Sequence, residues 1–246
     1  MKESRTVDWR SNATRYPYPL TVKVAQPPHP FNQPRNTMKL ALFYDTETTG
    51  LPLFKEPSEH PDQPHIVQLA ACLVDLDTRN TIASMDVIVQ PSGFTISDEV
   101  AAIHGITTEH AMDVGIPEKM ALDMLMALWN ERLRIGHNES FDARIVRIAQ
   151  SRFGKSESEL TLWKAGQAEC TCWMARPHTK LEKNKLPKLG EAYQHFIGAP
   201  MENAHSAMAD VQGCMAVYFA MQDLPQRQPE PVTGESGCWD GRRPCL

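Results

Sequence analysis

Three short segments of the sequence combine acidic side chains with spacings that suit metal-assisted chemistry. They are residues 45–50 (DTETTG), 138–142 (NESFD) and 205–210 (HSAMAD). Their candidate ligands are four carboxylates and one histidine: Asp45, Glu47, Asp142, Asp210 and His205. Hard cations such as Mg²⁺ or Mn²⁺ prefer carboxylate and water oxygens, and this set contains no thiol. The combination indicates a divalent-metal site for phosphodiester chemistry.

The first segment follows an apolar run of strand length, residues 40–45 (LALFYD). Positions two apart on a strand share a face, so Asp45 and Glu47 are expected to project to the same side. Residues 48–52 (TTGLP) have turn chemistry, which places the pair near the carboxyl end of the strand, where open α/β sheets bind ligands. A lone Asp-x-Glu is more often a solvated strand end, so this pair does not establish a site by itself.

The second segment begins a helix. Residues 118–133 have helical periodicity after Pro117, and residues 135–137 indicate a short strand. Phe141, Ile145 and Ile148 then mark the buried stripe of the next helix, with Asp142 near its start. There the carboxylate is close to a strand end and within reach of a metal. The alternative is structural, because the helix dipole alone favours aspartate in a first turn.

The third segment precedes an amphipathic helix that is marked by Ala207, Val211 and Cys214. Ser206 is predicted to cap this helix, which leaves His205 just outside it. A histidine on a loop can move over an attacking water, whereas Asp210, inside the helix, is held rigidly enough to bind metal. The alternative is an ordinary surface histidine and an ordinary helical aspartate.

The order of the three segments resembles the DEDD exonuclease superfamily, the DnaQ-like 3′–5′ exonucleases with an RNase H-like fold. The spacing His-x-Ala-x-x-Asp of residues 205–210 is similar to that of the DEDDh branch, and the resemblance covers residues 38–222. It implies that Asp45, Glu47, Asp142 and Asp210 bind two ions, Mg²⁺ or Mn²⁺, and that His205 activates water. Two such ions can stabilise the attacking and the leaving oxygen of an in-line displacement.

The resemblance also implies residues that contact the substrate. Thr48 and His104 resemble positions that line the pocket for the terminal nucleotide, and Asn138 is expected to have an orienting role. The expected products are nucleoside 5′-monophosphates released from a 3′ end.

The strand pattern fits a mixed α/β fold. Three strands without intervening helices, at residues 38–45, 66–75 and 81–89, predict a meander, and later helices alternate with short strands near residues 135 and 170. We therefore expect an RNase H-like mixed five-stranded sheet flanked by helices.

The composition allows one core and two extensions. With 246 residues and 41% hydrophobic content, the chain can bury one good core. Residues 37–222 are predicted to form the exonuclease domain, residues 1–36 a Pro-rich flexible extension and residues 223–246 a tail. The sequence has neither an apolar run of membrane-spanning length nor a secretory signal pattern, so we expect a cytoplasmic protein without membrane association.

Three functions are compatible with these residues. The favoured one is a 3′–5′ exonuclease on single-stranded DNA, as a processing enzyme or as a proofreading partner of a DNA polymerase. The second is an RNA exonuclease with the same site, because the identified residues do not read the 2′-hydroxyl. The third, a non-catalytic nucleic-acid-binding module, is disfavoured by the intact set of carboxylates. The net charge of −5 argues against electrostatic coating of long nucleic acid and is compatible with local contacts to a terminus.

Overall fold

The computed structural model describes residues 38–202 and 204–225. The predicted extension at residues 1–36 and most of the predicted tail at residues 223–246 lie outside the described residues. Within the described part, no helix is both long enough and apolar enough to cross a membrane.

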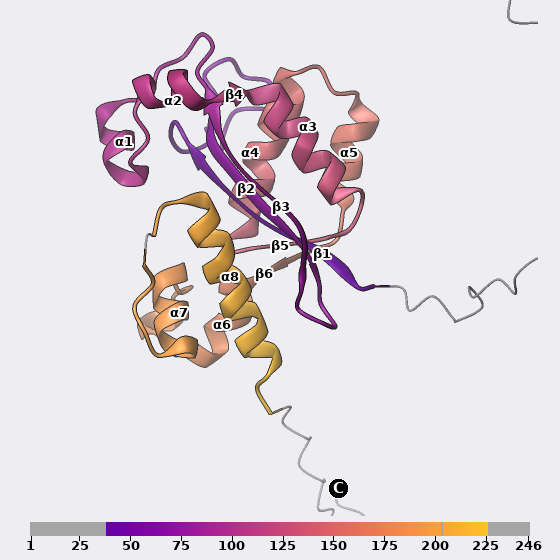
Figure 1. Ribbon diagram of the computed structural model, residues 1–246, viewed down its shortest axis with the longest axis vertical. Coiled ribbons are helices and arrows are strands. Elements are labelled where there is room, and N and C mark those ends of the chain that lie inside the picture. Colours follow the sequence, from indigo (N-terminus) through magenta and orange to yellow (C-terminus); the bar gives the residue numbers. More distant parts are fainter. Residues whose placement is uncertain (1–37, 203, 226–246) are drawn as a thin grey trace, which may run out of the picture. The chain divides into compact units, whose positions relative to one another are not determined.

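The described residues form one mixed sheet with helices on both faces (Figure 1). The strands are β1 (Leu40–Thr48), β2 (Ile66–Asp75), β3 (Thr81–Gln90), β4 (Ile116–Pro117), β5 (Leu133–Gly136) and β6 (Ala168–Cys170). The helices are α1 (Asp98–His104), α2 (Thr108–Val114), α3 (Glu118–Trp129), α4 (Glu139–Arg152), α5 (Glu157–Ala165), α6 (Thr171–Thr179), α7 (Leu189–Ile197) and α8 (Ala207–Gln222), with a 3₁₀ turn η1 at Glu182–Asn184.

The sheet order is β4-β3-β2-β1-β5-β6. The predicted meander is confirmed, since β2 is antiparallel to both β1 and β3. Strands β5 and β6 continue the sheet in parallel on the other side of β1. The mixed α/β fold is therefore confirmed, but the predicted number of five strands is wrong by one. The sixth, β4, has two residues, which is too short to produce a periodic pattern, and it pairs in parallel with the end of β3.

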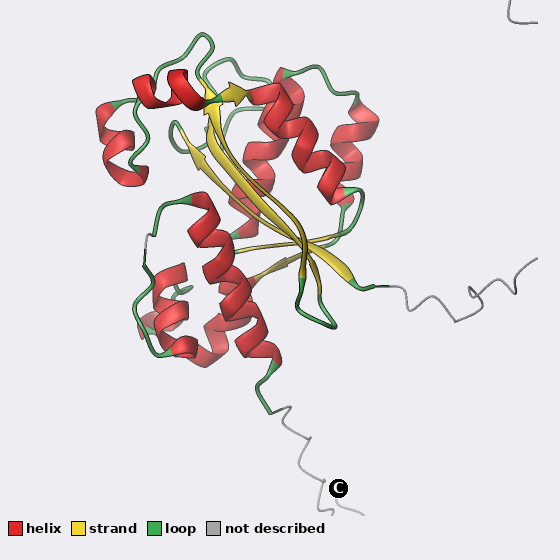
Figure 2. Ribbon diagram, viewed as in Figure 1, coloured by secondary structure: helices red, strands yellow, loops and turns green. Residues whose placement is uncertain are grey.

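Alternation along β1 divides the molecule into two layers around the sheet (Figure 2). Leu42 and Tyr44 belong to a core that includes residues of α3, α4 and α5. Ala41 and Phe43 belong to a second core that includes Val211 and other residues of α8. By the same alternation Asp45 and Glu47 continue on the α8 face, whereas Thr46 and Thr48 continue on the face covered by α4.

Residues with left-handed φ angles determine where helices α3 and α7 end. The helix predicted at residues 118–133 ends at Trp129, because Asn130 and Glu131 have left-handed φ angles of 36° and 62°. Helix α7 ends at Gly198, which has a φ of 82°. Helices α2, α5 and α6 were not predicted.

Trp163 is the aromatic centre of the core under α4 and α5. It is 1% exposed, and its ring meets Trp129 and Tyr44 edge-to-face at centroid distances of 4.9 and 5.8 Å. Its indole N–H donates to the carbonyl of Ala143 in α4 at 3.0 Å. This residue therefore fastens α5 to α4 and both helices to β1.

Replacement of Trp163 by alanine should lower the free energy of unfolding by about 3–5 kcal/mol, the usual cost of removing a buried large aromatic side chain. Urea denaturation measures this change. Trp173→Ala is the matched control, because Trp173 is 56% exposed, and it should cost about 1 kcal/mol or less. Equal losses for the two variants would contradict this account of the core.

Candidate active site

The acidic pair of β1 lies where the strand approaches its carboxyl end. In the β1–β2 ladder, Asp45 is paired with Ala70 and Glu47 with Gln68. Both carboxylates are partly buried and project to the face that α8 covers. The prediction that Asp45 and Glu47 share one face is confirmed, although the strand continues to Thr48 rather than ending at Asp45.

Asp142 reaches the same strand from α4, on the other face of the sheet. Its Oδ1 accepts two hydrogen bonds from Thr46, one from the backbone N–H at 3.0 Å and one from the hydroxyl at 2.7 Å. Both bonds end on one oxygen, which leaves Oδ2 for a cation. Thr46 was not predicted as a site residue. Its position between Asp45 and Glu47 could have indicated it, because the residue between two ligands of a strand points to the opposite face and can bond to a ligand there.

His205 and Asp210 approach from the start of α8. His205 lies before the helix as predicted, with an exposed side chain and a left-handed φ of 71°. Asp210 is inside the helix, with its backbone N–H bonded to the carbonyl of Ser206 at 2.9 Å. One ligand atom each from Glu47, His205 and Asp210 lie within 4.8 Å of one another, which is close enough to hold a single metal ion.

The pKa values of the four carboxylates reflect how close these groups lie to one another. Burial raises the pKa of Asp45 well above its usual range, and the charges of Asp142, Asp210 and Glu47 raise it further. Burial raises the pKa of Glu47 to about 8, with the charges of Asp210 and Asp142 as further causes. Three segments that are distant in the sequence therefore place their acidic groups within electrostatic reach of each other.

Asp142 and Asp210 have weaker shifts because each receives hydrogen bonds. Burial raises the pKa of Asp142 to about 7, against the lowering effect of the bonds from Thr46. Burial also raises the pKa of Asp210, while the backbone and the charge of His205 lower it. An all-oxygen donor set that repels itself when ionised fits divalent cations, which favour the ionised form of every ligand.

His104 lies beside this group. Burial lowers its pKa, and the charge of His205 lowers it further. Its Nδ1 accepts a hydrogen bond from the backbone N–H of Ile106 at 3.1 Å, which places the ring proton on Nε2 in the neutral form. Nε2 is buried and has no hydrogen-bond partner within the described part of the chain. His104 thus has an unused donor close to His205.

Thr48 and Asn138, the other two predicted substrate residues, lie at the end of β1 and directly before α4. The hydroxyl of Thr48 donates to the carbonyl of Gly50 at 2.8 Å and so stabilises the turn after β1. Asn138 precedes α4 with a left-handed φ of 67°, is exposed, and makes no side-chain capping bond to the helix. Contacts of either residue with a nucleotide stay a prediction.

A buried ion pair fixes the start of α4, one turn from Asp142. The hydroxyl of Tyr44 donates to Oε1 of Glu139 at 2.8 Å, and Arg134 Nε lies 3.3 Å from the same oxygen. Arg134 also donates from Nη1 to the carbonyl of Trp163 at 2.7 Å. Breaking such a pair leaves an uncompensated buried charge, so the network resists displacement of α4. These residues were missed, although a tyrosine and an arginine in otherwise apolar strands are the signal.

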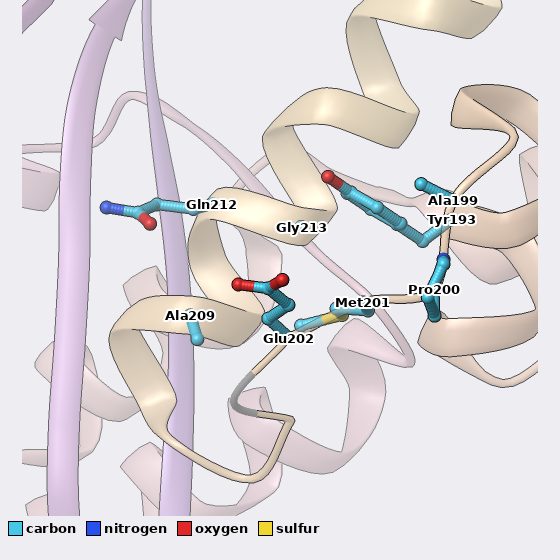
Figure 3. A pocket seen from close by; sticks show the side chains of 8 residues that line it. All are labelled: Tyr193, Ala199, Pro200, Met201, Glu202, Ala209, Gln212 and Gly213. Carbon is cyan, nitrogen blue, oxygen red and sulfur yellow. The ribbon is translucent and has the colours of Figure 1, made fainter.

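A separate pocket of about 400 Å³ lies between α7 and α8 (Figure 3). It is lined by Tyr193, Ala199, Pro200, Met201, Glu202, Ala209, Gln212 and Gly213. A Cβ at Gly213 would lie 2.9 Å from the side chain of Met201, so this glycine permits the close approach. None of the predicted metal ligands lines this pocket. The pocket is therefore distinct from the acidic cluster.

A family model matches the part of the chain that contains these residues. The model of the exonuclease family (RNase_T) matches residues 42–218, a range that contains all the predicted carboxylates and His205. No curated protein matches the sequence.

Solved structures show the same fold. Exonuclease I of E. coli in complex with a dT13 oligonucleotide has a TM-score of 0.59 at 22% identity, over 75% of this chain and 41% of that one. The zinc-bound form of an E. coli exonuclease I complex with single-stranded DNA has a TM-score of 0.58 at 22% identity, over 75% and 40%. A product-bound exonuclease I has 0.59 at 19%, over 75% and 43%. The chain thus spans about two fifths of the length of these exonuclease I chains.

The raised pKa values predict how the stability of the metal-free protein depends on pH. Glu47 and Asp142 have pKa values of about 8 and about 7 in the folded state, above the values of about 4 of an unfolded chain. The folded state therefore binds more protons than the unfolded state between these limits, so the contribution of these groups to stability falls as the pH rises. Thermal melting in EDTA should show this loss.

A divalent cation replaces those protons, so the stabilisation by saturating Mg²⁺ should grow as the pH rises from about 5 to about 8. Replacement of Glu47 by glutamine should reduce that growth. The control is Glu157→Gln, a change of an exposed glutamate in the first turn of α5. A gain from Mg²⁺ that is independent of pH in the unmodified protein would contradict the proposed coupling.

Proposed function

Because the chain belongs to the exonuclease family, as a DnaQ-like 3′–5′ exonuclease of the RNase H-like superfamily, we propose that it removes nucleotides from the 3′ end of single-stranded DNA. One observation carries the proposal. Asp45, Glu47, Asp142 and Asp210 converge with His205 from three separate segments on one end of β1. Metal-dependent phosphodiester hydrolysis uses such a concentration of metal ligands beside a group that can accept a proton.

The four carboxylates would hold two Mg²⁺ or Mn²⁺ ions. When bound, the ions polarise the scissile phosphate and stabilise the attacking and the leaving oxygen. Asp45 is the best candidate for a ligand shared by both, because the charges of all three other carboxylates act on it. Thr46 holds Oδ1 of Asp142 and so fixes the direction in which its other oxygen points.

His205 would take the proton from the attacking water. Its exposed position on a loop allows the ring to approach and leave the site, and Glu47 and Asp210 lie next to it. His104 would face the terminal nucleotide, with its Nε2–H as the donor to a sugar or phosphate oxygen. Thr48 and Asn138 complete the proposed substrate contacts.

Single-stranded DNA is the favoured substrate, because the matched exonuclease I structures include complexes with dT13 and dA16 oligonucleotides. The products would be deoxynucleoside 5′-monophosphates. Both a processing enzyme and a proofreading partner of a DNA polymerase would release them. Faster cleavage of a mismatched primer terminus than of a matched one, with a further gain when a polymerase is added, would favour the proofreading role.

An exonuclease of this kind should need a free 3′ end. A linear single-stranded oligonucleotide should release 5′-monophosphates from its 3′ end in Mg²⁺, whereas a circular strand or a 3′-phosphorylated one should resist. Asp45→Asn should abolish release while retaining the fold, because it removes a metal ligand and relieves repulsion. Chromatography of labelled products measures both effects. Equal cleavage of circular and linear DNA would exclude an exonuclease, and faster degradation of a matched RNA strand would transfer the proposal to RNA.

Two substitutions distinguish whether His205 acts as a general base or as a metal ligand. His205→Ala should lower kcat by about 10²–10⁴-fold, the usual contribution of general acid–base catalysis, with little change in Mn²⁺ affinity. Asp210→Ala should instead weaken Mn²⁺ binding. Calorimetric titration with Mn²⁺ compares the two variants. If His205→Ala lost metal affinity as Asp210→Ala does, His205 would be a metal ligand.

A further inference from the structure

Gln68 is an amide inside an otherwise apolar stretch of β2, residues 66–74 (IVQLAACLV). Its side chain is 8% exposed, and it is paired with Glu47 in the β1–β2 ladder. Residues that are directly opposite in a ladder project to the same face, so Gln68 lies beside Glu47 on the side that α8 covers. A buried polar group in a strand interior requires hydrogen-bond partners.

Both ends of this amide have a partner. Its Oε1 accepts a hydrogen bond from the backbone N–H of Ala207, the first residue of α8, at 3.1 Å. Its Nε2 donates to Oδ1 of Asp86 on β3 at 2.8 Å. An ionised carboxylate only accepts hydrogen bonds, so Asp86 determines which end of the amide faces α8. The acceptor is thereby directed at the helix.

The start of α8 depends on this bond. Ser206 has the N-cap position, but its side chain makes no capping hydrogen bond, so the prediction that Ser206 caps the helix is wrong in this respect. The first N–H groups of a helix have no partner within the helix. For Ala207 the partner is a side chain of the sheet, an arrangement that ties the end of the helix to the strand beside Glu47.

We propose that Gln68 is a positioning residue for the hydrolytic reaction, holding the start of α8, and through it His205, over Glu47. His205 is two residues before Ala207 and lies outside the helix, with a left-handed φ of 71°. Asp210 lies within the helix, where its N–H donates to the carbonyl of Ser206, whereas His205 lies outside the helical hydrogen-bond ladder. Loss of the tether should therefore displace His205 more than Asp210. This inference rests on the proposed exonuclease function and the role of His205 in it.

The test is the replacement of Gln68 by methionine, which has a similar volume but cannot accept or donate the two bonds. A misplacement of about 1 Å can cost on the order of 100-fold in rate, so kcat should fall by about 10- to 100-fold. KM for a single-stranded oligonucleotide and the affinity for Mn²⁺ should change by less than about threefold, because the carboxylates stay in place. Gln90→Met is the matched control on β3, where the lost bond goes to the carbonyl of Met112 instead. It should retain full activity.

A double-mutant cycle shows whether Gln68 acts through His205. If it does, Gln68→Met should cause no further loss of kcat in the His205→Ala background, whereas independent effects would multiply.

Two results would overturn the proposal while the unmodified chain remains active. They are an unchanged kcat of Gln68→Met and a full additional loss in the His205→Ala background. If Gln68→Met fails to fold, Asp86→Ala replaces it, because Asp86 is exposed and its loss only frees the amide to turn. That variant should still lower kcat at constant Mn²⁺ affinity, and an unchanged kcat would contradict the proposal. An inactive unmodified chain would instead refute the proposed function.

Discussion

Four carboxylates lie close together in a partly buried site, where their negative charges repel one another. Hydrogen bonds and ion pairs of the surrounding residues hold them together against this repulsion. The effect is visible in the raised pKa values of Asp45, Glu47, Asp142 and Asp210. Neither burial nor like charge favours an ionised carboxylate, so the stable charged form of this site requires cations.

Strand β1 supports the repelling carboxylates from both of its faces. Asp45 and Glu47 project toward α8, while the intervening Thr46 projects toward α4 and binds Asp142. Each helix is then anchored beside its acidic residue. The ion pair of Arg134 and Glu139 holds the start of α4. Gln68 holds the start of α8. The charged groups are thus supported by neutral or compensated neighbours that are bonded to the sheet.

The sequence was sufficient to predict the general fold and to single out the acidic side chains that the structure places close together. The alternation of β1 placed Asp45 and Glu47 on one face, and the periodicity after residue 207 placed His205 outside a helix and Asp210 inside it. These features depend on local patterns of period 2 or 3.6, which a single segment contains. The short β4 and the helices α2, α5 and α6 were missed, because their patterns are brief and their boundaries depend on tertiary packing.

The supporting residues were harder to predict for a different physical reason. Thr46 bonds to a residue 96 positions away, and Gln68 bonds to one 139 positions away. Such bonds depend on the register of strands and on helix placement, which no local pattern specifies. Ser206 illustrates the consequence, since its type and position favour a cap, yet a distant glutamine satisfies the N–H of Ala207. Polar residues within otherwise apolar strands could have indicated these supporting positions.

If these carboxylates form one centre for two divalent cations, anomalous diffraction from crystals soaked in Mn²⁺ should locate both ions, because manganese scatters anomalously and the ligands do not. We expect two manganese peaks roughly 4 Å apart, the spacing typical of two-metal sites, in contact with Asp45 and shared among Glu47, Asp142 and Asp210. Peaks that avoid Asp45, or an empty carboxylate cluster in crystals that bind manganese elsewhere, would contradict it.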